Sequence, residues 1–159
     1  MGWIGKILRV GRVTEPAPPR PPQQSKSAAA VRGSLQIRHV DAGSCNGCEV
    51  EIAAAFGPVY DAERFGVRLV ASPRHADALL VTGVVTRNMA GPLLATLEAT
   101  PRPRWVIACG DCALNQGVFE GAYGVVGAVG DVVPVDVEIA GCPPEPGQII
   151  AALRSVTGK

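Results

Sequence analysis

Short runs rich in β-branched and apolar residues recur along the chain from residue 35 onward. They end at small residues or turns, which is typical of strands, and they occupy residues 35–40, 67–71, 76–83, 104–110 and 133–141. Segments of helical composition lie at residues 47–56, 88–100 and 146–156. Asn88 is a candidate N-cap of the second helix, and Pro146 is permitted in the first turn of the third. Strands that alternate with helices predict an α/β fold with a mostly parallel sheet and helices on both faces.

The first 34 residues have a different pattern. Residues 1–13 form a short amphipathic segment, with an apolar stripe opposite a basic face; the stripe is Trp3, Ile4, Ile7 and Leu8, and the basic residues are Lys6, Arg9 and Arg12. This pattern fits an interfacial anchor, a helix docked on a membrane-bound partner, or a frayed terminus. Residues 14–34 have five prolines between positions 16 and 22, which predicts a polyproline II linker. Residues 35–159 then form the folded domain.

Composition narrows the function classes. The chain has 159 residues, of which 47% are hydrophobic and 18% charged. The net charge of +1 gives no electrostatic footprint for nucleic acid. No apolar run approaches the roughly 18–20 residues that a membrane span needs. Five cysteines are an odd number, which argues against a fully paired disulfide framework. We therefore expect a compact intracellular domain whose cysteines need a chemical explanation.

The cysteines follow three of the predicted strands. Cys45 and Cys48 come after the first strand, Cys109 and Cys112 close and follow the fourth, and Cys142 follows the fifth. The carboxyl ends of parallel strands share one edge of the sheet, where open α/β folds bind ligands. Glycine accompanies every cysteine region, and we expect the backbone amides near Gly47, Gly110 and Gly141 to donate hydrogen bonds to anionic sulfur.

Several chemistries compete for these thiols. The two Cys-x-x-Cys pairs superficially resemble a zinc site, but residues 49–108 separate them, whereas zinc ribbons use roughly 15–20 residues. A thioredoxin-like redox pair would explain only Cys45 and Cys48. Inert buried cysteines are common singly but fit two such pairs poorly. A 4Fe–4S cluster takes four thiolates from several loops. The spacing favours this cluster and leaves zinc and thiol–disulfide chemistry as alternatives.

Four blocks of sequence resemble a known family. They read SCNGCEVEI (44–52), VTGVVTRNM (81–89), WVIACGDCALNQG (105–117) and VPVDVEIAGCPPEP (133–146). Together they resemble the small electron-transfer subunit shared by group 4 membrane-bound NiFe hydrogenases, formate-hydrogenlyase type included, and respiratory complex I. The resemblance covers about residues 35–155. It implies a flavodoxin-like α/β fold without flavin, carrying one 4Fe–4S cluster at the carboxyl ends of the strands, against a large subunit.

The resemblance also implies a role for individual residues. Position by position, the cluster ligands are Cys45, Cys48, Cys112 and Cys142. Cys109 is the spare cysteine, which we expect to be a small core residue. Glu51 matches a glutamate of the family and is a candidate proton-relay or interface residue. Glu49 fits better as a carboxylate stabilised by the helix N-terminus, and His39 as a surface or strand-end residue.

The spacing within the first pair separates two branches of the family. Complex I subunits have two adjacent cysteines where this chain has Cys45-Asn46-Gly47-Cys48, and hydrogenase subunits have the spaced pair. The resemblance therefore implies a relay of single electrons between a ferredoxin-like subunit and the NiFe site of a hydrogenase-like large subunit. Membrane-arm subunits complete the expected complex, placed peripherally on the cytoplasmic face of the inner membrane. The equivalent complex I subunit is the alternative, and a zinc-stabilised binding module is a remote one.

Overall fold

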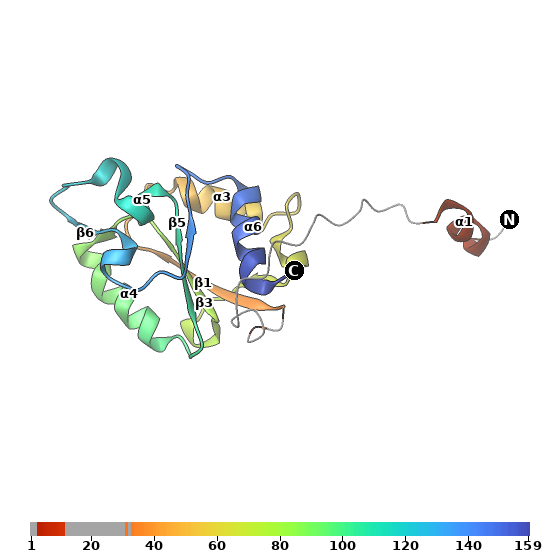
Figure 1. The fold of residues 1–159 in the computed structure, drawn as a ribbon, viewed down its shortest axis with the longest axis horizontal. Coiled ribbons are helices and arrows are strands. Elements are labelled where there is room, and N and C mark those ends of the chain that lie inside the picture. Colours follow the sequence, from red (N-terminus) through yellow and green to blue (C-terminus); the bar gives the residue numbers. More distant parts are fainter. Residues whose placement is uncertain (1–2, 12–30, 32) are drawn as a thin grey trace.

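The computed structural model describes residues 3–11, 31 and 33–159 (Figure 1). The strands are β1 (Leu35–Asp41), β2 (Val67–Leu69), β3 (Ala78–Thr82), β4 (Val85–Thr86), β5 (Trp105–Cys109), β6 (Val125–Gly127) and β7 (Val137–Ile139). The α-helices are α1 (Trp3–Val10), α3 (Gly47–Ala55), α4 (Arg87–Ala99), α5 (Asp111–Asn115) and α6 (Pro146–Thr157). Residues 1–2, 12–30 and 32 lie outside the described residues, and they include both ends of the predicted amphipathic segment and most of the predicted linker, residues 14–34.

The main sheet has five parallel strands in the order β2-β1-β3-β5-β7. Counted along the chain within this sheet, the order is 2-1-3-4-5, which is that of flavodoxin-like folds. The predicted fold class is therefore confirmed. The strand order reverses between β1 and β3, and this reversal opens a crevice at the carboxyl edge where such folds bind ligands.

Helices cover both faces of the sheet (Figure 1). On one face Leu80 packs in a core with Ile52 of α3 and Leu153 of α6. On the other face Leu79 packs in a second core with Leu93 of α4. Every residue of β3 and of β5 is buried. A strand that is buried on both faces has a continuous apolar sequence. This is why these two strands show no alternation of apolar and polar residues.

Two local predictions were wrong, and one element was not predicted. Helix α4 begins at Arg87 with Thr86 as its N-cap, so Asn88 lies inside the helix. The last strand is limited to Val137–Ile139, because Pro134 has no amide to donate to the sheet and the Asp136 carboxylate accepts the Val106 amide instead, at 2.8 Å. The small antiparallel sheet of β4 and β6 was not foreseen.

Candidate functional site

The five cysteines lie where the sequence placed them, at the carboxyl edge of the sheet. Cys45 and Cys48 come between β1 and α3 and in the first turn of α3, Cys109 ends β5, Cys112 lies in α5, and Cys142 follows β7. Cys45 and Cys142 are exposed, whereas Cys48, Cys109 and Cys112 are buried. A group held by thiols of both kinds would sit partly at the surface of this chain.

Backbone hydrogen bonds join the loops that carry the cysteines. The Gly110 amide donates to the Ile139 carbonyl at 2.7 Å, and the Asp111 amide donates to the Gly141 carbonyl at 2.9 Å. The Asp111 carboxylate returns the contact by accepting the Gly141 amide at 2.7 Å. These bonds fix the Cys109–Cys112 loop against the residues that precede Cys142.

Glycines leave space for the sulfur atoms. A Cβ at Gly110 would lie 2.5 Å from Cys48 Sγ, and one at Gly117 would lie 3.1 Å from Cys112 Sγ. Gly110 also has a φ of 92° and a ψ of 152°, a conformation that is essentially restricted to glycine. A side chain at Gly110 would therefore displace the thiol of Cys48. The glycines form a cradle for sulfur on two sides of the site.

The thiols influence one another electrostatically. Burial, followed by the nearby thiols of Cys142, Cys45 and Cys48, raises the pKa of Cys112. A hydrogen bond with the Cys109 thiol lowers the pKa of Cys48, although burial opposes this, and the same contact together with burial raises the pKa of Cys109. Cys109 is fully buried and contacts the Cys48 thiol, whereas Cys142, Cys45 and Cys48 lie near enough to Cys112 to raise its pKa.

We expected amides near Gly47, Gly110 and Gly141 to donate to sulfur. The Gly110 amide binds the Ile139 carbonyl and the Gly141 amide binds the Asp111 carboxylate, so these two amides themselves are not the donors. A buried amide without a hydrogen-bond acceptor is costly. Acceptors of the neighbouring strand and loop therefore bind these two amides. Gly47 differs because it begins α3, and the first-turn amides of a helix have no acceptor within the helix.

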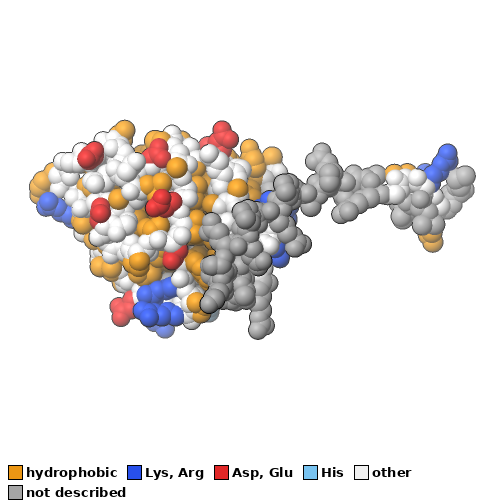
Figure 2. All heavy atoms as spheres, in the orientation of Figure 1, with side chains coloured by type: hydrophobic (Ala, Val, Ile, Leu, Met, Phe, Trp, Pro, Cys, Tyr) orange, Lys and Arg blue, Asp and Glu red, His pale blue; other side chains and the backbone are white. Residues whose placement is uncertain are grey.

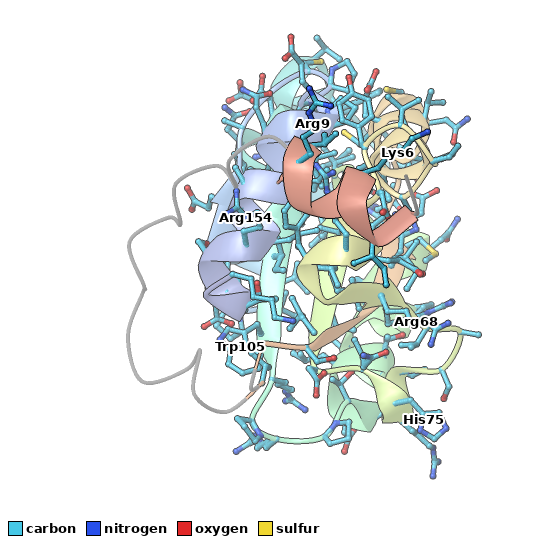
Figure 3. All side chains as sticks on the ribbon, turned by 90° about the vertical axis from the view of Figure 1, so that its right-hand side faces the viewer. Lys6, Arg9, Arg68, His75, Trp105 and Arg154 are labelled. Carbon is cyan, nitrogen blue, oxygen red and sulfur yellow. The ribbon has the colours of Figure 1, made fainter. Side chains whose placement is uncertain are left out.

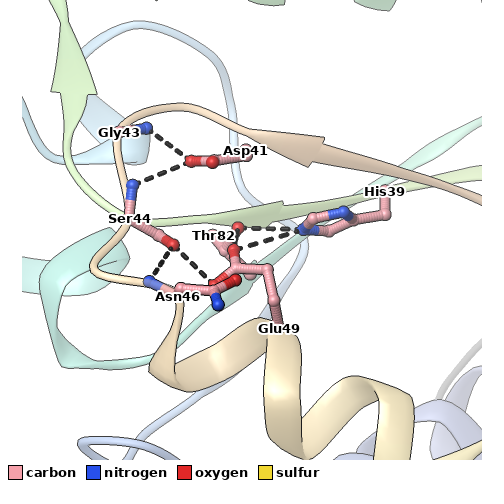
Figure 4. A network of polar contacts seen from close by, with 7 residues as sticks. All are labelled: His39, Asp41, Gly43, Ser44, Asn46, Glu49 and Thr82. Atoms are coloured by element: carbon pink, nitrogen blue, oxygen red, sulfur yellow. Dashed lines mark hydrogen bonds and ion pairs between the residues drawn. The ribbon is translucent and has the colours of Figure 1, made fainter.

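A polar network that the sequence did not predict lies beside the first cysteine pair (Figure 4). The Glu49 carboxylate accepts a hydrogen bond from the Ser44 hydroxyl at 2.5 Å and another from the Thr82 hydroxyl. The ring nitrogen Nε2 of His39 lies 2.9 Å from the Thr82 hydroxyl oxygen and 3.5 Å from Glu49 Oε1. Since the Thr82 proton points to Glu49, His39 donates to Thr82. The network connects β1, β3 and α3.

His39, which we expected to be a surface or strand-end residue, is a partly buried member of this network within β1. Its side chain is about one quarter exposed, at 27%, and burial lowers the pKa of His39 although the Glu49 and Asp41 carboxylates oppose the shift. Glu49 does lie in the first turn of α3 as expected, but hydroxyl groups also hold it. The sequence feature that could have indicated this network was Thr82, a polar residue at the end of an otherwise apolar strand.

Large apolar side chains are exposed on α3, where Cys48 lies, and just after α5, where Cys112 lies. Figure 2 shows hydrophobic side chains spread over the visible face of the domain. Val50 of α3 is 59% exposed, and Val118 and Tyr123 in the loop after α5 are 84% and 87% exposed. The Arg87 guanidinium lies over the Tyr123 ring, 4.9 Å from its centre. Glu51, the candidate relay residue, is half-buried in α3.

The donor set fits a cluster of several iron atoms. Within the described residues, no three Cys, His, Asp or Glu side chains are grouped so that they could hold one metal ion. Zinc requires its sulfur ligands about 2.3 Å from a single ion. A 4Fe–4S cluster takes four cysteine thiolates, one on each iron, so the sulfurs need not share one ion. Cys45, Cys48, Cys112 and Cys142 supply thiols of the kind and number that such a cluster takes.

Residues 45–156 match the sequence profile of a family described as the 20 Kd subunit of NADH ubiquinone oxidoreductase. The chain belongs to this family. The match begins at Cys45, includes all five cysteines, and ends in α6. The matched region of the 20 Kd subunit family therefore contains every cysteine of the site described above.

Two relatives come from hydrogenases. Formate hydrogenlyase subunit 7 of Escherichia coli is 45% identical over 128 residues, which are 80% of this chain and 50% of that protein. A probable membrane-bound hydrogenase subunit, mbhJ of Pyrococcus furiosus, is 51% identical over 114 residues, which are 72% of this chain and 68% of that protein. The chain thus spans only half the length of the first of these relatives. Both relatives are subunits of oxidoreductase complexes.

A third relative is named for quinone chemistry. This NADH-quinone oxidoreductase subunit of Herpetosiphon aurantiacus is 46% identical over 113 residues, 70% of this chain and 63% of that protein. Among solved structures, a chain of the archaeal membrane-bound sulfane sulfur reductase matches with a TM-score of 0.69 and 35% identity, over 82% of this chain and 74% of that one. A chain of an NAD⁺-reducing NiFe hydrogenase shares the fold, at 21% identity and a TM-score of 0.56, over 72% of this chain and 85% of that one.

One of these relatives and one of these structures are named for membrane-bound complexes. Among the residues that the structure describes, no helix has both the length and the apolar content to cross a bilayer. Lys6 and Arg9 project from α1 and are exposed (Figure 3), as is Ile4 on the apolar stripe, at 74%.

Proposed function

We propose that this chain is the electron-relay subunit of a membrane-associated, hydrogenase-like complex. Cys45, Cys48, Cys112 and Cys142 hold one 4Fe–4S cluster, which accepts and releases single electrons when bound. The electrons pass between a ferredoxin-like subunit and the active site of a NiFe-hydrogenase-like large subunit. The observation that supports this proposal is that cysteines from three strand ends lie at one edge of the sheet, with Cys45 and Cys142 exposed.

The residues of the chain supply the environment of the cluster. Gly110 and Gly117 leave room for the sulfurs of Cys48 and Cys112. The apolar core around β5 excludes water from the buried side, and exclusion of water is one determinant of a cluster potential. Val50 on α3 and Val118 just after α5 are exposed apolar side chains, which suits a large-subunit interface. We expect the chain to be an obligate subunit.

The equivalent subunit of a complex I-type quinone oxidoreductase is the second candidate. The 46% identity to the NADH-quinone oxidoreductase relative favours it. The spaced pair Cys45-Asn46-Gly47-Cys48 favours the hydrogenase branch, as do the two hydrogenase relatives. The large subunit that co-purifies with this chain separates the candidates, since a hydrogenase subunit retains the cysteine pairs that bind nickel and iron and a quinone-reducing subunit lacks them.

Metal analysis tests the proposal against the remote alternative, a zinc-stabilised binding module. The complex is purified anaerobically through a tag on this chain, and iron, acid-labile sulfide and zinc are measured. The proposal expects both iron and acid-labile sulfide, of which about four of each belong to the cluster of this chain. The ferredoxin-like subunit and the large subunit would add to the totals. Zinc without iron or sulfide would refute both relay candidates.

The N-terminal segment completes the proposed arrangement. Residues 1–13 anchor the subunit at an anionic membrane surface, with the apolar stripe of α1 facing the acyl chains and Lys6 and Arg9 facing the headgroups. The exposed apolar and basic side chains of this helix support the assignment, and residues 14–34 then act as a linker to the iron–sulfur domain of residues 35–159. We place the complex on the cytoplasmic face of the inner membrane, with membrane-arm subunits as further partners.

Glu51 remains the proposed proton-relay or interface residue. It lies about one helical turn after Cys48 on α3 and is half-buried, and this placement supports the proposal. A change of Glu51 to Gln would leave the cluster in place and remove the pH dependence of its midpoint potential. An unchanged pH dependence would limit Glu51 to a structural or interface role.

A further inference from the structure

The polar network beside the first cysteine pair suggests a role for Glu49 that the family resemblance does not supply. We propose that Glu49 is a positioning residue: it clamps the Cys45–Cys48 loop to the sheet and fixes a carboxylate beside the cluster, which keeps the cluster potential low. This inference rests on the proposed function, since it concerns the same four ligands.

The clamp follows from the contacts of the carboxylate. Oε2 accepts from the hydroxyl of Ser44, the residue immediately before Cys45, at 2.5 Å. The same hydroxyl oxygen accepts the Asn46 amide at 2.9 Å, so Ser44 holds the loop on both sides of Cys45. Oε1 accepts from Thr82, the last residue of β3, which is fully buried. Glu49 therefore connects the cysteine loop to the centre of the sheet.

Further contacts leave the loop little freedom. A Cβ at Gly83 would lie 2.3 Å from the Ser44 amide nitrogen, so the loop lies directly on the end of β3. The Asp41 carboxylate accepts the amides of Gly43 and Ser44 at 2.9 and 2.8 Å. His39 donates to Thr82 and thereby orients the hydroxyl that reaches Glu49 (Figure 4). The carboxylate of the residue that follows Cys48 thus has a fixed position.

The position has an electrostatic consequence. The side chain of Glu49 is only 18% exposed, so water screens its charge less than that of a surface carboxylate. A fixed negative charge beside a cluster opposes the addition of an electron and lowers the reduction potential. Ser44 and Thr82 hold the charge in place but carry none, so the two contributions can be separated by mutation.

The test is an EPR-monitored redox titration of the anaerobically purified complex, together with the rate at which a chelator removes iron. Glu49→Gln keeps the shape of the side chain but removes the charge and one hydroxyl acceptor. We expect a midpoint potential more positive than that of the wild type and faster iron loss. Ser44→Ala and Thr82→Val keep the charge, and we expect faster iron loss with a smaller shift of the potential. Glu98→Gln, an exposed carboxylate on α4, is the matched control and should match the wild type in both measurements.

The outcomes distinguish a failure of the role of Glu49 from a failure of the proposed function. An iron-loaded Glu49→Gln complex with the potential and iron-loss rate of the wild type would overturn the role of Glu49 alone. An iron-free wild type would overturn the proposed function and this inference together. If Glu49→Gln assembles without iron, the Ser44→Ala and Thr82→Val complexes decide: faster iron loss supports the clamp, and the wild-type rate overturns it.

Discussion

Gly110 offers the sharpest structural test of the site, because it combines a glycine-only conformation with a direct contact to a ligand. A Cβ at this position would lie 2.5 Å from Cys48 Sγ, with the Gly141 carbonyl oxygen 3.5 Å away on another side. Non-bonded atoms of this kind prefer roughly 3.5–4.0 Å. The Gly110→Ala change therefore forces the sulfur or the backbone to move by about 1 Å.

Two effects of Gly110→Ala differ in magnitude and in readout. The backbone strain at φ 92° and ψ 152° costs about 1–3 kcal/mol of the free energy of unfolding. The displaced sulfur affects cluster binding, because a functional site must hold its geometry within about 0.5 Å. We expect the variant to be destabilised by about 2–3 kcal/mol in urea denaturation of the full chain. We expect the complex to contain about four iron atoms fewer than the wild-type complex.

Gly121→Ala is the matched control. Gly121 also has a positive φ, of 73°, but a Cβ there would meet no atom within 4 Å. This change should cost roughly 1–2 kcal/mol through backbone strain alone and leave the iron content at the wild-type level. The reasoning would be refuted if Gly110→Ala retained full iron content, or if both variants lost iron equally.

Three further predictions concern other parts of the chain. Reversing the charges of α1 in the double variant Lys6→Glu/Arg9→Glu should weaken binding to anionic vesicles at least thirtyfold, since each basic residue contributes about 1 kcal/mol; co-sedimentation that matches the wild type would refute the anchor. Burial lowers the pKa of His39 in the folded chain below its ordinary 6.5, so the unfolded chain binds a proton at His39 more readily. The free energy of unfolding should therefore fall as the pH drops below 6.5. His39→Gln should reduce that fall in urea titrations at several pH values, and an unchanged pH dependence would contradict this prediction. Asp111→Ala should lower the free energy of unfolding by about 1–2 kcal/mol because the Gly141 amide loses its acceptor. Asp111→Asn keeps an acceptor oxygen at this position and should lose less. Equal losses in thermal denaturation would contradict the hydrogen bond between Gly141 and Asp111.

The sequence predicted the main sheet because its central strands are unambiguous. Residues 78–82 and 105–109 are buried on both faces, and such strands appear as continuous apolar runs with turns at each end. The cysteines could be placed for the same reason, since a parallel sheet brings the carboxyl ends of its strands to one edge. Spacing and topology were sufficient at this level.

Long-range polar contacts were not predictable in this way. The Glu49 network joins residues up to 43 positions apart in the sequence, such as His39 and Thr82, and no local pattern specifies which hydroxyl a carboxylate will reach. Amides near Gly110 and Gly141 were assigned to sulfur because the sequence could not show that the strand of Ile139 and the Asp111 carboxylate would bind the amides of these two glycines. The β4–β6 sheet was missed because each of its strands has three residues or fewer.

The account depends most on the assignment of the four ligands. Its most direct test is the EPR spectrum of the reduced complex, recorded for the wild type and for single Cys→Ala variants of all five cysteines, with iron measured on each sample. The account predicts that the cluster signal is lost or altered in the variants of Cys45, Cys48, Cys112 and Cys142 and is kept in the variant of Cys109. A signal that survives Cys112→Ala and disappears in Cys109→Ala would contradict it.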